Sequence, residues 1–68
     1  MNLSPRYLIK VLEQNGFVFQ RSKGSHHLYH NASTKKTVIV PVHGGKDLKK
    51  GTLLDILKQA DIDKNDLN

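Results

Sequence analysis

Three short segments rich in β-branched and aromatic residues lie between two segments with helical spacing, and this order limits the folds open to the chain. Turn-forming residues separate the three segments, including Gly16, the Lys23-Gly24-Ser25 turn and a polar loop over 31–35. The pattern is typical of antiparallel strands joined by short connections. The expected elements, in order, are a helix over 4–14, strands over 17–22, 26–31 and 36–42, and a helix over 52–60.

The first helix has clear signals at both ends. Ser4 is suited to cap the free backbone N–H groups, and Pro5 then occupies the first helical position, where its missing N–H costs nothing. Asn15 and Gly16 end the helix, because both tolerate the left-handed backbone conformation. The apolar face between these ends consists of Tyr7, Leu8, Val11 and Leu12.

The second helix is expected to start at a capping box. Thr52 would cap the helix, and Asp55, three residues on, would reach back to the cap. Five residues give the helix its apolar stripe: Leu53, Leu54, Ile56, Leu57 and Ala60. The last eight residues, which include Leu67, are mostly polar and are expected to be frayed or dependent on a partner.

These elements predict an α+β fold of the order α-β-β-β-α, with a three-stranded antiparallel sheet and both helices on one face. Phe17 and Phe19 would share one face of the first strand, and Pro41 would end the third strand or mark a free edge. The chain has 68 residues, enough for a single domain over 1–68 with an ordered core of about 3–60.

Charge and composition narrow the function. The net charge is +5, and residues 1–54 carry nine bases against two acids. A basic body favours a polyanionic partner such as a nucleic acid, although solubility alone would also account for it. The chain has no cysteine, no apolar stretch long enough to cross a membrane and no visible signal peptide, so we expect a cytoplasmic protein.

Two sequence blocks carry a family resemblance. The string Gly24-Ser25-His26-His27-Leu28-Tyr29 resembles the Gly-Ser-His core of HicA-type mRNA interferases, and Pro41-Val42-His43 followed by the 48–54 segment is similar to their second signature. The resemblance covers roughly 3–60. It implies a fold like a double-stranded-RNA-binding domain, endoribonuclease activity on mRNA as a type II toxin, and a HicB antitoxin that covers the active site in a hetero-oligomer. It also implies that His26 is catalytic.

The residues around His26 suit RNA cleavage without a metal or cofactor. The substrate's own 2′-hydroxyl can attack the adjacent phosphate if a base accepts its proton, and histidine titrates near working pH. Gly24 lets the backbone approach a phosphate, and Ser25 is a possible hydrogen-bond donor. His43 is a possible second acid–base group, or a solvent-facing residue with no such role. A solvated surface histidine is the alternative for His26.

The other histidines fit this site less well. His27 alternates to the opposite side of the strand from His26. His30 shares the side of His26 but lies about 13 Å along the strand, which disfavours a zinc site between them.

Phosphate binding is assigned to lysines. Lys46, Lys49 and Lys50 lie just before the second helix, whose N-terminus attracts anions, and Lys23 flanks the His26 turn. A solvated lysine patch is the alternative. Tyr29 is expected to pack in the core rather than stack on a base.

Two other functions remain open from the residues alone. The first is a non-catalytic RNA-binding module with the same double-stranded-RNA-binding-domain-like fold and the same basic surface. The second is a pure protein-interaction domain, which predicts no salt-sensitive binding to RNA.

Overall fold

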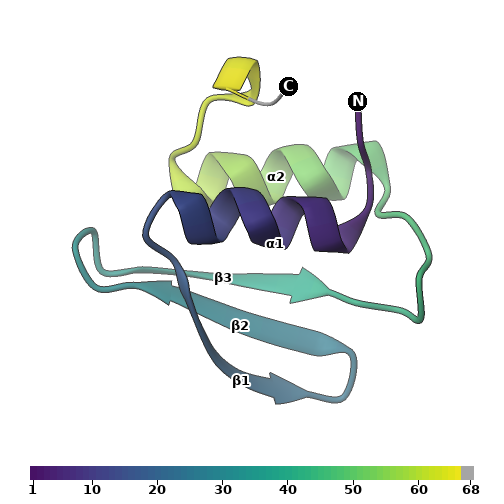
Figure 1. The fold of residues 1–68 in the computed structure, drawn as a ribbon, viewed down its shortest axis with the longest axis horizontal. Coiled ribbons are helices and arrows are strands. Elements are labelled where there is room, and N and C mark those ends of the chain that lie inside the picture. The colour runs from purple at the N-terminus through teal and green to yellow at the C-terminus, as the bar shows by residue number, and fades with distance from the viewer. Residues whose placement is uncertain (67–68) are drawn as a thin grey trace.

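The computed structural model describes residues 1–66 and has the expected element order (Figure 1). Helix α1 is followed by the strands β1, β2 and β3, then by helix α2 and a short 3-10 helix, η1. Their bounds are α1 Pro5–Gln14, β1 Val18–Lys23, β2 His26–Asn31, β3 Lys36–Pro41, α2 Lys50–Ala60 and η1 Lys64–Asp66. The predicted α-β-β-β-α order and α+β class are therefore confirmed.

The three strands form one antiparallel sheet in the order β1-β2-β3. Both helices pack along β3 (Figure 1), whereas all six residues of β1 are exposed. Tyr29, Val38 and Val40 project from the covered face of the sheet into the core. The helical side chains that meet them, all almost fully buried, include Leu8, Leu12, Leu53 and Leu57.

Helix α1 begins and ends where the sequence predicted. The Ser4 hydroxyl oxygen accepts a hydrogen bond from the Tyr7 N–H at 3.0 Å, and Pro5 occupies the first turn. Asn15 is the C-cap, and Gly16 follows with a φ of +91°. This left-handed conformation favours glycine, which explains why the helix stops at this residue.

The N-cap of helix α2 lies three residues earlier than predicted, so the capping box is wrong. Lys49 is the N-cap, no side chain caps the helix, and Thr52 lies inside its first turn. Leu48 explains the difference: it is 6% exposed, and its N–H donates to the Leu3 carbonyl at 2.7 Å. Burying a leucine contributes about 1.5–3 kcal/mol, whereas a capping side chain contributes about 1 kcal/mol.

The two phenylalanines both lie on the helix-covered side of the sheet, but Phe17 lies just before β1 rather than within it, contrary to the predicted start of the strand. Phe17 precedes β1, is 2% exposed, and its N–H donates to the Leu12 carbonyl at 3.0 Å. It therefore belongs to the end of α1 rather than to the strand. Phe19 is 46% exposed on β1, beyond the cover of the helices, and its ring meets the Tyr29 ring edge-on.

The core reaches slightly beyond the predicted boundary at residue 60. Ile62 is buried, and its N–H donates to the Leu57 carbonyl at 2.9 Å. The expectation of a frayed tail is thus wrong for Ile62. The expectation for Leu67 lies outside the described residues.

Candidate active site

The second face of the sheet carries the candidate site. His26, Leu28 and His30 alternate along β2 with the buried side chains, so they project from the face that the helices leave open. Their partners on β3 are Pro41, Ile39 and Thr37, respectively. Ile39 is 49% exposed, so this open face presents apolar as well as polar side chains to solvent.

A groove of about 440 Å³ lies where the open face of β2 and β3 meets the outer side of α2. Because α2 and β3 run in opposite directions (Figure 1), the start of the helix lies at the His26–Pro41 end of the groove. The lining residues are His26, Leu28, Thr37, Ile39, Pro41, Thr52, Asp55, Ile56 and Gln59.

His26 is held by backbone contacts while its side chain stays exposed. It is the first residue of β2, between Lys23 of β1 and Pro41 of β3 in the sheet register. The preceding turn contains Gly24 at a φ of +59°. The carbonyl of Ser25 accepts a hydrogen bond from the Val42 N–H at 2.7 Å. The turn is therefore tied to the end of β3, and the imidazole opens into the groove from a fixed backbone.

The predicted phosphate-binding residues gather at this end of the molecule but do not line the groove. Lys23 is directly opposite His26 in the sheet register, and Ser25 is half-buried in the adjoining turn. Lys46, Lys49 and Lys50 are exposed on the segment that leaves β3 and enters α2, at the same end as the β1–β2 turn (Figure 1). Together they give the His26 end a positive rim.

The remaining histidines occupy different surroundings. His27 lies on the helix side of the sheet, half-buried, with its ring 5.8 Å from that of Phe19. The Nδ1 atom of His30 lies 2.9 Å from the Thr37 hydroxyl oxygen. His43 is exposed beyond the end of β3 and does not line the groove. Within residues 1–66, no three His, Asp or Glu side chains are grouped closely enough to hold a metal ion.

Tyr29 packs in the core, as predicted. It is 4% exposed, and its pKa is raised above the ordinary 10.0, first by burial and second by the negative charge of Glu13. Its side chain lies on the covered face of the sheet, so it is not available to stack on a ligand at the groove.

The sequence did not reveal the α2 side of the site. Thr52, Asp55 and Gln59 line the groove, but the first two were interpreted as a helix cap. The signal was present in their spacing, because positions three and seven residues apart share one side of a helix, here beside the apolar stripe.

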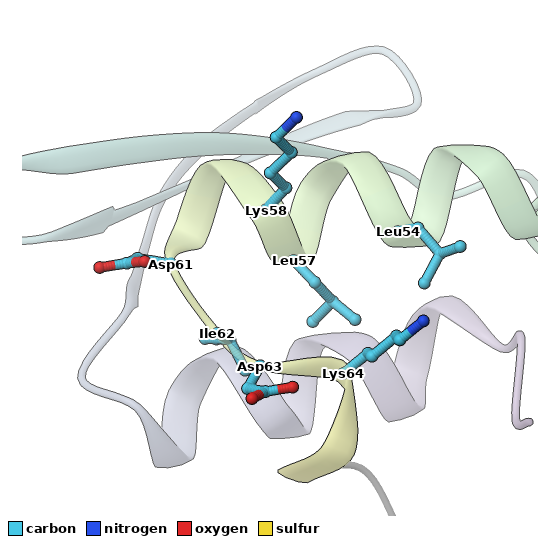
Figure 2. A pocket seen from close by; sticks show the side chains of 7 residues that line it. All are labelled: Leu54, Leu57, Lys58, Asp61, Ile62, Asp63 and Lys64. Atoms are coloured by element: carbon cyan, nitrogen blue, oxygen red, sulfur yellow. The ribbon is translucent and has the colours of Figure 1, made fainter.

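A second hollow, about 520 Å³ in volume, lies between the C-terminal half of α2 and the segment that follows it (Figure 2). It contains none of the predicted site residues. Its lining consists of Leu54, Leu57, Lys58, Asp61, Ile62, Asp63 and Lys64. Although this hollow is larger, it lacks the histidine and the turn that distinguish the groove.

In the described part of the chain, no helix combines the length and apolar character needed to cross a bilayer.

Comparison with known families agrees with the motifs at this site. A family model described as the HicA toxin of bacterial toxin–antitoxin systems matches residues 5–62, which is most of the 68-residue chain. No curated protein matches the chain closely enough to count as a relative. The matched region contains every element from α1 to α2, including the Gly24-Ser25-His26 turn and the groove. The chain therefore belongs to the HicA family, the toxins of bacterial toxin–antitoxin systems.

Proposed function

We propose that the chain is an endoribonuclease toxin that cleaves mRNA in the cytoplasm through His26, without a metal ion. The observation that carries this proposal is the position of His26. It is exposed, it lies in the groove between the open sheet face and α2, and its backbone is fixed by β1 on one side and β3 on the other.

The chemistry uses the substrate's own nucleophile. The 2′-hydroxyl oxygen attacks the adjacent phosphorus, the bond from phosphorus to the 5′-oxygen breaks, and a 2′,3′-cyclic phosphate forms. His26 accepts the proton of the 2′-hydroxyl as general base, and the leaving 5′-oxygen takes a proton from the imidazolium or from water. Such a mechanism needs one well-placed proton acceptor and positive charge near the phosphorane.

The lysines supply that charge. Lys23 lies opposite His26 in the sheet, and Lys49 and Lys50 flank the start of α2, whose first N–H groups no side chain caps. Ammonium groups and free backbone N–H groups both attract a phosphate. Lys46 extends the same rim, and Ser25 and His43 are candidates for an auxiliary hydrogen bond or proton transfer.

An antitoxin of the HicB type would inhibit the toxin by covering the same face in a hetero-oligomer. Val18 and Ile39 are 61% and 49% exposed, and both project from the open face that carries His26. Exposed apolar side chains beside a functional group are typical of a surface that a protein partner buries.

The test is RNA cleavage by the purified chain in EDTA. We expect wild type to cleave and His26→Ala to lose about 10²–10⁴-fold in rate, as for removal of a general base. His27→Ala is the matched control, because the neighbouring histidine lies on the opposite side of the sheet. Tight binding with intact RNA would instead identify a non-catalytic RNA-binding module, and cleavage that EDTA abolishes would contradict the mechanism.

A further inference from the structure

We infer that the groove beside His26 binds the base next to the scissile phosphate, and that Asp55 selects guanine. The inference deepens the proposed function, since it rests on RNA being the substrate. It concerns the α2 side of the groove, where Thr52, Asp55 and Gln59 face the open strands β2 and β3.

The groove has room for a nucleotide beside His26. Along β3 it extends from Thr37 to Pro41, about 13 Å at the rise of a strand. Along α2 it extends from Thr52 to Gln59, about 10 Å at the rise of a helix. A phosphate held at the His26 end therefore leaves the rest of the groove for an adjoining base.

The two sides of the groove differ in chemistry, as the face and the edge of a nucleobase do. The strand side offers the apolar surfaces of Leu28, Ile39 and Pro41, with Ile39 half exposed. The helix side offers a hydroxyl, a carboxylate and a carboxamide beside the almost fully buried Ile56. A nucleobase has a flat face that packs on apolar or aromatic surfaces and an edge that forms hydrogen bonds. In the groove, the face would lie on the strands and the edge would point to α2.

Charge decides which part of the nucleotide lies at Asp55. Asp55 is the one carboxylate among the lining residues, and it would repel a phosphate. Among residues 1–66, Lys36 and Asp61 form an ion pair at 3.5 Å, whereas Asp55 forms none. The backbone phosphates therefore follow the lysine rim near His26, and the base lies at Asp55.

A carboxylate distinguishes the four bases by their donors. It only accepts hydrogen bonds, and its two oxygens can accept two parallel N–H groups. Guanine presents two such groups side by side, N1–H and the N2 amino group, whereas cytosine and adenine present one amino group at that edge. Uracil presents one N–H flanked by carbonyl oxygens that repel the carboxylate. Gln59, one turn after Asp55, carries an amide donor suited to the guanine O6.

The experiment measures binding without cleavage. In the His26→Ala background, the affinity of a short oligouridylate with one central guanosine is compared with that of the all-uridine oligonucleotide by fluorescence anisotropy. We expect guanosine to strengthen binding about tenfold, within the range for one bidentate contact. Adding Asp55→Asn should reduce the preference to about twofold or less, because the amide replaces one acceptor with a donor.

The control is Asp61→Asn, which makes the same charge change at the C-cap of α2 and should leave the preference intact. Thermal melts establish that each variant is folded. A guanine preference that survives Asp55→Asn, or that is absent from the start, overturns the inference.

Failure of the guanine subsite can be distinguished from failure of the proposed ribonuclease function. A guanine preference that depends on Asp55, in a chain whose wild type leaves RNA intact, would support the subsite and contradict the ribonuclease. Cleavage by wild type, with no base preference in binding, would contradict the subsite alone.

Discussion

Asn31 is a buried polar residue that joins three parts of the chain. Its Nδ2 group donates to the Asn15 carbonyl at 3.0 Å, and its Oδ1 accepts from the N–H groups of Ser33 and Thr34 at 2.9 and 3.3 Å. A Cβ atom at Gly16 would lie 3.2 Å from the Asn31 Nδ2. One side chain thus connects the end of α1 to the β2–β3 hairpin, and Gly16 leaves the space that this connection needs.

We expect Asn31→Ala to lower the free energy of unfolding by about 1–3 kcal/mol, because it leaves buried hydrogen-bonding groups without partners. Asn31→Asp should also destabilise the fold, since it loses the donor and places a carboxylate oxygen against the Asn15 carbonyl. Thermal melts measure both, with roughly 4–8 °C expected per kcal/mol in a domain of this size. Two variants that melt at the wild-type temperature would mean that these hydrogen bonds are replaced by water at no cost.

Tyr29 makes the stability of the fold depend on pH in the alkaline range. Its pKa is raised in the folded chain by burial and by Glu13, so the folded state favours the neutral phenol. The resulting stabilisation is fully present below the ordinary pKa of 10.0 and is lost as the pH rises through the higher folded value. Stability should therefore fall more steeply above pH 10 in wild type than in Tyr29→Phe. Denaturant melts across that range provide the measurement, and parallel pH profiles would contradict it.

At the scale of elements, the start of α2 serves two purposes. Leu48 fixes the helix start by packing into the core, and this leaves the N-cap to Lys49, whose side chain does not cap the helix. A threonine cap three residues later would be the better local signal, but burial of Leu48 outweighs it. The result is a helix N-terminus with two lysines and free N–H groups beside the groove.

We expect Lys49→Glu and Lys50→Glu each to weaken RNA binding severalfold without destabilising the fold. An acid at a helix N-terminus interacts favourably with the helix dipole by about 0.3–1 kcal/mol, so the melting temperature should stay level or rise slightly. Each lost phosphate contact should reduce the slope of log affinity against log salt by about 0.7 for single-stranded RNA.

The matched control for these two variants is Lys58→Glu, at the other end of the same helix. Equal weakening by all three substitutions would indicate an effect of net charge rather than a phosphate site at the start of α2.

At the scale of the whole molecule, the order of elements followed from local signals, but their contacts did not. The cap at Ser4, the stop at Gly16 and the turn at Gly24 each act within a few residues, so sequence alone placed α1 and β2 well. The departure of Phe17 from β1 and the early start of α2 depend on which side chains the core buries.

The same division applies to the candidate site. Its motif predicted His26, and the alternation of β2 placed His27 on the other face. The groove itself forms only when α2 packs along β3, which brings Asp55 and Gln59 to the strands from more than 25 positions along the chain from His26. No local pattern contains that proximity, because it is a property of the packed layers.

The most direct test of the account is the chemistry of the cut. An RNA carrying a single 2′-deoxy substitution at a mapped cleavage site is incubated with the purified chain in EDTA, and the product ends are determined. We predict no cut at the substituted position, and a 2′,3′-cyclic phosphate with a 5′-hydroxyl at every other site, because the 2′-oxygen is the nucleophile that His26 activates. Cleavage at the deoxy position, or 5′-phosphate ends, would contradict this mechanism.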